Sequence, residues 1–138
     1  MTDSNKKNDR IKTLKDEQVK KKMEDLKEWS LSSDKKEIFR IIQFDSFGEA
    51  ISFVNNVAEL SEKIKHHPKS ITIRFDEVEV HLKTMDTDGL SEKDLDLAEE
   101  INFIADWEVY FQNWINSTKV IVTLLVLFAM ILLWRYFI

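Results

Sequence analysis

The sequence predicts an α+β domain, in which a four-stranded antiparallel sheet carries helices on one face, followed by a C-terminal transmembrane helix. Three observations support this prediction. Short segments alternate apolar and polar residues, as half-buried strands do. A longer segment between them has its apolar residues at spacings of three and four, as an amphipathic helix does. The end of the chain is almost entirely apolar.

Length and composition bound what the chain can be. Its 138 residues leave room for one compact domain and an appendage. A net charge of -5 argues against a general nucleic-acid binder, so no nucleic-acid partner is expected. The absence of cysteine excludes disulfides, thiolate catalysis and cysteine-based metal sites. The first residues have no apolar core behind them, so no secretory signal peptide is expected.

The elements are expected in the following order. Residues 1–28 form a charged N-terminal segment, partly helical, with its apolar residues in one narrow stripe. A β-branched and aromatic run at residues 38–44 predicts a strand, and residues 29–31 can pair with it. Ser46 and Glu49 have the spacing of a capping box, in which Glu49 reaches back to the Ser46 amide, and the helix behind them runs to about Lys65.

A β-hairpin is expected after this helix. Residues 71–75 and 78–84 each alternate apolar and polar side chains, with Asp76-Glu77 between them as a tight turn. One face of the hairpin is therefore expected to be buried and the other wet, as in a sheet covered by helices on a single face.

The chain after Gly89 contains no further glycine or proline, so helix is expected from Glu92 to the C-terminus. Residues 120–134 are apolar except for Thr123, and the run to Ile138 is close to the ~20 residues that a membrane-spanning helix needs. We therefore expect a single-pass C-terminal membrane anchor, with the preceding domain on the cytosolic or an equivalent side. The expected divisions are the charged segment 1–28, the α+β domain 29–106, an aromatic juxtamembrane helix 107–119 and the transmembrane helix 120–138.

A set of aromatic and basic side chains precedes the span. Aromatic rings with a polar edge collect at the headgroup level of a bilayer, and a lysine at the near edge fits the positive-inside rule. The same stripe could instead belong to a core or a dimer seam, and one stripe could serve both purposes. The residues expected at the membrane interface are Trp107, Tyr110, Phe111, Trp114 and Lys119.

Two adjacent histidines, His66 and His67, precede the only proline, Pro68, at the expected end of a helix. Imidazole has an unperturbed pKa near neutrality, so it can both accept and release a proton. Adjacent residues on a helix point about 100° apart, which disfavours a shared metal ion, and no metal site is expected. Without further context, the simpler interpretation is a helix C-terminus whose last carbonyls are bonded by imidazole.

The surrounding residues change this interpretation. From Ile38 to about Ile104 the chain resembles the pterin-4a-carbinolamine dehydratase family. The resemblance is carried by Ile-Phe-Arg at 38–40, by the aromatic and alanine spacing of 44–53, by Glu62-x-x-x-His66-His67-Pro68, and by Gly-Leu-Ser-x-x-Asp at 89–94.

The resemblance implies a four-stranded antiparallel sheet with helices on one face, and assembly as dimers or tetramers. It implies removal of water from a 4a-hydroxy-tetrahydropterin, with the pterin as substrate and with no cofactor or metal. His66 and His67 would supply the general acid and base, and Glu62 and Asp94 match supporting acidic positions.

One family position is changed. The family has a third histidine after the threonine that ends the hairpin, and Met85 stands there in this chain. A thioether is no useful proton donor or acceptor. The favoured hypothesis is a membrane-anchored dehydratase-like protein, weakly catalytic or noncatalytic, acting as an accessory subunit with protein partners or copies of itself. The alternative is a tethered dehydratase that works through His66 and His67.

Overall fold

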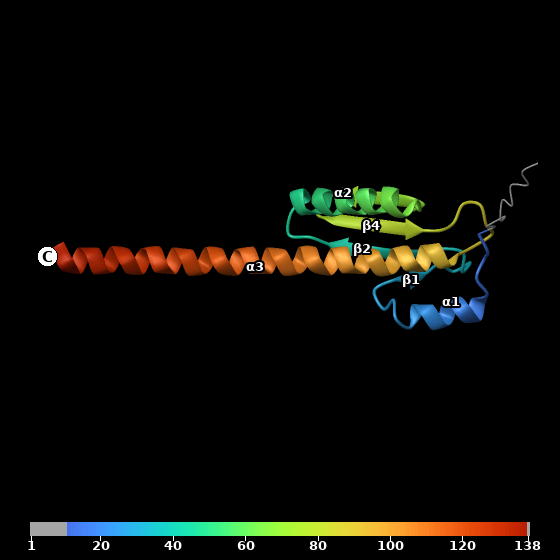
Figure 1. Cartoon of the computed structure of the whole chain (residues 1–138), viewed down its shortest axis with the longest axis horizontal. Coiled ribbons are helices and arrows are strands. Elements are labelled where there is room, and N and C mark those ends of the chain that lie inside the picture. Colours follow the sequence, from blue (N-terminus) through green and yellow to red (C-terminus); the bar gives the residue numbers. More distant parts are fainter. Residues whose placement is uncertain (1–10, 138) are drawn as a thin grey trace, which may run out of the picture. The chain divides into compact units, whose positions relative to one another are not determined.

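The computed structural model describes residues 11–137, without the side chains of residues 108, 109, 111–113 and 134–137. Residue contacts divide the chain into two units, Met1–Ile104 and Ala105–Ile138. The elements are α1 (Asp16–Met23), β1 (Ser30–Leu31), β2 (Ile38–Gln43), α2 (Phe47–Ile64), β3 (Ser70–Arg74), β4 (Glu77–Leu82) and α3 (Glu92–Phe137). Figure 1 labels all of them except β3.

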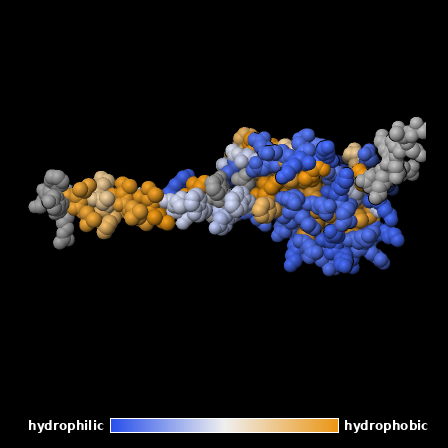
Figure 2. Space-filling view, in the orientation of Figure 1, coloured by the Kyte–Doolittle hydropathy of each residue, from blue (hydrophilic) through white to orange (hydrophobic). Residues whose placement is uncertain are grey.

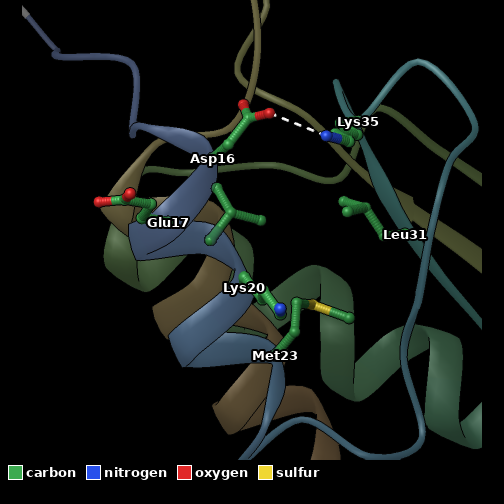
Figure 3. A pocket seen from close by; sticks show the side chains of 7 residues that line it. Asp16, Glu17, Lys20, Met23, Leu31 and Lys35 are labelled. Atoms are coloured by element: carbon green, nitrogen blue, oxygen red, sulfur yellow. Dashed lines mark hydrogen bonds and ion pairs between the residues drawn. The ribbon is translucent and has the colours of Figure 1, made fainter.

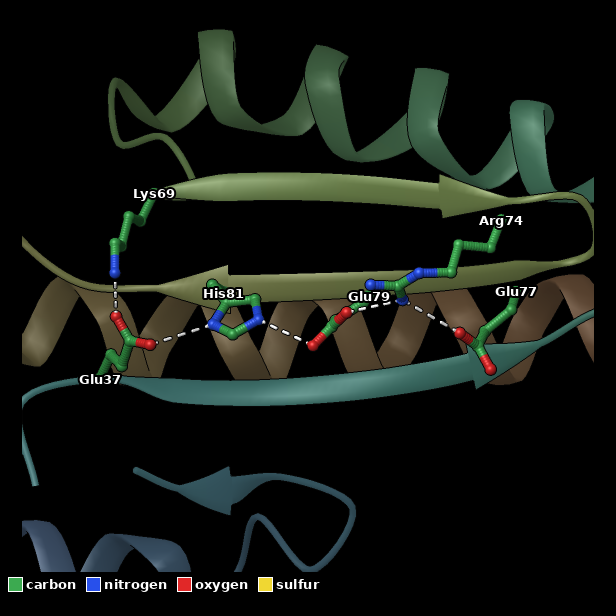
Figure 4. A network of polar contacts seen from close by, with 6 residues as sticks. All are labelled: Glu37, Lys69, Arg74, Glu77, Glu79 and His81. Atoms are coloured by element: carbon green, nitrogen blue, oxygen red, sulfur yellow. Dashed lines mark hydrogen bonds and ion pairs between the residues drawn. The ribbon is translucent and has the colours of Figure 1, made fainter. Parts of the chain in front are cut away.

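The four strands form one antiparallel sheet in the order β1-β2-β4-β3. Along β4, Val78, Val80 and Leu82 are fully buried, while the alternate residues lie on the opposite face. That opposite face carries a polar network, seen from the side away from the helices in Figure 4. The predicted α+β class, with an antiparallel sheet covered on one face, is therefore confirmed.

The hairpin turn lies one residue earlier than the sequence predicted. Arg74 pairs with Glu77, so the turn consists of Phe75 and Asp76 and not of Asp76 and Glu77. Two-residue hairpin loops commonly need positive φ at their first position. Phe75 has φ 54°, which takes it out of the strand. β4 likewise ends at Leu82, two residues before Thr84.

α2 begins at the predicted cap. The Ser46 hydroxyl accepts a hydrogen bond from the Glu49 amide at 3.3 Å. The Glu49 carboxylate accepts from the Asp45 amide at 3.1 Å, one residue before the amide that the capping box predicted. The buried residues of the helix recur every three or four positions, which places one face against the sheet. They are Ala50, Phe53, Val57 and Ser61.

A chain of charged side chains crosses three strands on the open face of the sheet (Figure 4). His81 lies between two carboxylates, with Nδ1 3.1 Å from Glu37 and Nε2 3.0 Å from Glu79. Glu37 also accepts from Lys69, and Glu79 accepts from Arg74 at 2.7 Å. The ammonium of Lys69, with a smaller contribution from His81, holds the pKa of Glu37 below its ordinary value. Arg74 and then His81 lower the pKa of Glu79.

These lowered pKa values predict acid destabilisation of the domain. The network stabilises the fold fully above the unfolded-state pKa of about 4.3 and loses that contribution as the pH falls through the lower folded-state values. The urea concentration at the unfolding midpoint of the full chain in detergent should therefore decrease as the pH is lowered from about 5 to about 3, the range in which the two carboxylates become protonated. Glu37→Gln should flatten this dependence, and an unchanged slope would contradict the assignment.

α3 comprises 46 residues, and its segment Trp114–Leu133 is long and apolar enough to cross a membrane. None of its described side chains is buried in this structure; Ile115 and Thr118 are half-buried and the others are exposed. Figure 2 shows hydrophobic residues covering the C-terminal part of this helix, whereas hydrophilic residues dominate the visible face of the domain. The predicted apolar C-terminal helix is therefore present.

Candidate functional site

The candidate site is formed where α2 ends. Lys65 adopts a left-handed backbone, with φ 55°, and the amides of Lys65 and His66 both donate to the Ser61 carbonyl. This left-handed cap stops the helix and turns the chain before Pro68. His66 is consequently directed toward the start of α3.

His66 forms the buried half of the site. Its Nε2 lies 2.8 Å from Oδ1 of Asp94, with side chains 11% and 0% exposed respectively. When Nε2–H donates to this carboxylate, the proton of His66 is fixed on Nε2. Nδ1 is then the nitrogen that can take up a proton in a reaction. The pair is an oriented imidazole of the kind used for general base catalysis.

Asp94 is itself held by three donors besides His66. Its Oδ2 accepts from the Thr84 hydroxyl at 2.7 Å, from the Ser91 amide at 2.7 Å and from the Ser91 hydroxyl at 3.1 Å. The hydroxyls of Thr84 and Ser91 lie 2.6 Å apart. Both residues are buried, so the orientation of His66 depends on a dry polar network that joins the end of β4 to the start of α3.

His67 lies in a different environment. Its Nε2 is 3.0 Å from Oε1 of Glu62, and the two side chains are 58% and 80% exposed. Each predicted histidine is therefore placed against one of the predicted carboxylates. Solvent screens the attraction between two exposed side chains, so such a pair contributes little stability. Glu62 therefore orients His67 less firmly than Asp94 orients His66.

A pocket of about 230 Å³ opens beside His66. It is lined by Ile64 at the end of α2 and by Lys93, Asp96 and Glu100 on α3. Met85 follows the network residue Thr84 directly and is 75% exposed, in a turn that comes after β4. The position at which the resemblance implies a third histidine thus holds a solvent-facing thioether.

Sequence reasoning missed the roles of Thr84 and Ser91. Ser91 stands in the Gly-Leu-Ser-x-x-Asp motif at 89–94, and its spacing from Asp94, which is that of a helix cap, was the available signal. The contact between Thr84 and Asp94 depends on how β4 and α3 come together, which local spacing does not encode.

A separate apolar pocket of about 280 Å³ lies between α1 and β1 (Figure 3). Val19, Met23 and Leu31 line it, and the ion pair between Asp16 and Lys35, at 2.9 Å, bridges it. Its lining contains none of the candidate site residues. Among the residues that the structure describes, no cluster of three His, Asp or Glu side chains is arranged to hold a metal ion.

The residues predicted at a membrane interface lie on α3. Trp107, Tyr110 and Trp114 are 57%, 66% and 55% exposed, and the rings of Trp107 and Tyr110 are 6.2 Å apart. Lys119 is exposed, and its carbonyl accepts from the Thr123 hydroxyl at 2.9 Å. The side chain of Phe111 lies outside the described residues.

Comparison with known proteins tests the family resemblance that the sequence showed. The sequence model of the family described as pterin 4 alpha carbinolamine dehydratase matches residues 12–104. A protein of Haloarcula marismortui named "Putative pterin-4-alpha-carbinolamine dehydratase" is 46% identical over 79 residues, covering 57% of this chain and 83% of the relative. A protein of the same name from Nocardia farcinica is 42% identical over 92 residues, covering 67% and 94%.

A solved structure has the same fold. The transcriptional coactivator/pterin dehydratase from Brucella melitensis superposes with a TM-score of 0.65 and 28% identity, covering 68% of this chain and 99% of that one. The antiparallel sheet, the helices on one face and the His-His-Pro segment define a pterin dehydratase-like domain. The chain belongs to the pterin 4 alpha carbinolamine dehydratase family.

Proposed function

We propose that this chain is a membrane-anchored member of the family whose domain is weakly catalytic or noncatalytic and serves as an accessory subunit of a membrane protein assembly. The observation that carries the proposal is Met85, a solvent-facing thioether at the position of the family's third histidine. Loss of one general acid or base typically lowers a rate by about 10²- to 10⁴-fold. A pterin would then be a ligand or a poor substrate, with no cofactor.

The apolar part of α3 supports the anchor. Trp114–Leu133 has the length and composition of a membrane span, and none of this segment is buried within the structure. Exposed apolar side chains over a whole helix require a nonaqueous surrounding or a partner. We assign residues 120–138 to the bilayer and residues 107–119 to its interface. Lys119 at the near edge fits a domain on the cytosolic or an equivalent side.

A charge in the middle of the span tests the anchor. Leu125→Arg places an ionised group at the bilayer centre, which costs about 2.5–3.5 kcal/mol on insertion scales. We expect this variant to shift from the membrane pellet to the soluble fraction after alkaline extraction, whereas Leu125→Phe should stay in the pellet. Equal distribution of the parent and Leu125→Arg would contradict the anchor.

The second candidate function is active dehydration of a 4a-hydroxy-tetrahydropterin. The bond between His66 and a fully buried Asp94 favours it, since this geometry keeps one imidazole oriented for proton transfer. Turnover by the full chain in detergent decides between the two candidates, with His66→Ala as control. We expect a rate close to the uncatalysed background; a clear rate that His66→Ala removes would establish the tethered enzyme.

A further inference from the structure

The segment before α1 runs past the turn that leads into α3 (Figure 1). Thr13 forms an antiparallel bridge with Ser91, and the Leu14 amide donates to the Leu90 carbonyl at 2.8 Å. The approach is close, since a Cβ added to Gly89 would lie 3.2 Å from Cγ2 of Thr13. We call residues 11–14 the N-terminal strap, because they lie across this turn and join it to α1.

The far end of the strap is held by α1. Val19 is the buried residue of that helix, and Leu26 and Trp29 behind it are buried as well. One turn after Val19, Lys22 forms an ion pair with Glu92 at the start of α3, at 3.1 Å. α1 therefore keeps the strap beside the turn.

Apolar packing holds the strap itself only loosely. Lys12 and Thr13 are exposed, and Leu14 is half-buried. A pocket of about 380 Å³ lies between the strap and the start of α3, lined by residues 11–14, 18 and 91–93. The position of the strap on the turn consequently depends on the bridge and on the Leu14 hydrogen bond.

One peptide group connects the strap to the candidate site. The Leu90 carbonyl and the Ser91 amide belong to the same planar peptide bond, so they point in opposite directions and turn together. The carbonyl accepts from Leu14 on one side, and the amide donates to Oδ2 of Asp94 at 2.7 Å on the other. Hydrogen bonds in such a chain polarise one another, so the bond to the carbonyl strengthens the bond from the amide. The Leu14 amide thus fixes the donor that Asp94 receives.

We propose that the N-terminal strap positions the candidate site, with the Leu14 amide as the group that acts. Through one peptide it holds the carboxylate of Asp94, and that carboxylate holds Nε2 of His66 at 2.8 Å. If the peptide rotated, Asp94 would lose a donor and could turn away from the imidazole. Leu14 is accordingly a positioning residue, and displacement of α1 would loosen the site. This holds whether or not the site dehydrates a pterin, because it concerns the orientation of one imidazole.

Leu14→Pro tests the strap because proline has no amide hydrogen to donate. Thr13, which precedes it, is already extended in the bridge, as a residue before proline prefers to be. Lys12→Pro is the matched control, since the Lys12 amide donates to no residue that the structure describes. Leu14→Ala is the second control, because it removes most of the side chain and keeps the amide.

The full chain, with isotope-labelled histidine, is measured by NMR in detergent micelles at a pH at which the imidazoles are neutral. Nitrogen–proton correlation spectra distinguish an imidazole protonated on Nε2 from one protonated on Nδ1. The rate at which the Nε2 proton of His66 exchanges with water is the second readout. Exchange of the β4 amides, in the middle of the sheet, reports on opening of the whole domain.

We expect His66 to carry its proton on Nε2 in the parent chain and in both controls. In Leu14→Pro, a population protonated on Nδ1 should appear. The Nε2 proton should exchange about tenfold faster, as when one main-chain hydrogen bond is lost from a local opening equilibrium. The β4 amides should not change, and neither should His67, which pairs with the exposed Glu62.

Two outcomes would overturn the inference in folded samples. The same His66 signals in Leu14→Pro and Lys12→Pro would show that the amide of residue 14 has no special part. A full effect from Leu14→Ala would assign the result to the side chain instead of the hydrogen bond. Because neither readout needs turnover, a failed dehydration assay leaves both outcomes unchanged.

A second variant decides the matter if Leu14→Pro does not fold. Val19→Ala weakens the docking of α1 and leaves the Leu14 amide in place. Exchange of the His66 Nε2 proton should then rise about threefold relative to the β4 amides, because loss of buried methyl groups favours release of the helix and its strap. An unchanged ratio would reject the positioning role.

Discussion

Replacing Asp94 with alanine is expected to destabilise the α+β domain by about 3 kcal/mol, because buried donors are left without an acceptor. The Asp94 side chain is fully buried and accepts from His66, Thr84 and Ser91. Thr84 and Ser91 are also buried, so the donors that Asp94 now satisfies are shielded from solvent. The loss would therefore disconnect the end of α2, the end of β4 and the start of α3 at once.

Urea unfolding of the full chain in detergent micelles measures this effect. Trp29 is 4% exposed and reports on the domain core once Trp107, Trp114 and Trp134 are changed to phenylalanine. Asp96→Ala is the matched control, since Asp96 is an exposed carboxylate on the same helix and should change stability by less than about 0.5 kcal/mol. A similarly small change for Asp94→Ala would show that the network contributes little to the fold.

Met85→His is expected to raise the rate of 4a-hydroxy-tetrahydropterin dehydration by about 10²-fold or more, because it returns a proton-transfer group to the altered position. The remainder of the candidate site is present, with His66 fixed by Asp94 and His67 beside Glu62. Met85 is exposed, so a histidine there introduces no overpacking.

Two controls separate catalysis from other effects of the substitution. Met85→Gln adds polarity without a group that titrates near neutrality, and it should stay near the rate of the parent chain. Adding His66→Ala to Met85→His should remove the gain. If Met85→His and Met85→Gln have the same rate in folded samples, the surroundings of the site have changed as well. Under the accessory role, His66 would then be kept only as part of the buried network with Asp94.

Residue patterns alone predicted most of the fold because burial on one face imposes a period on the sequence. The alternation along 78–82 placed Val78, Val80 and Leu82 in the core, and the structure confirms this. The hairpin turn was misplaced by one residue because Phe75 occupies a left-handed conformation that its own propensity disfavours. There the pairing of Arg74 with Glu77 prevailed over local preference.

By itself the sequence determined the class of the domain, the apolar C-terminal helix and the identities of the paired histidines, because periodicity, hydropathy and a short motif are local properties. Only the tertiary structure decided which carboxylate each histidine faces, and that Thr84 and Ser91 hold Asp94. It also decided that Phe47, at the start of α2, stacks on Phe75 in the β3–β4 turn. These contacts join residues on separate elements, and the packing of helices on a sheet fixes such distances.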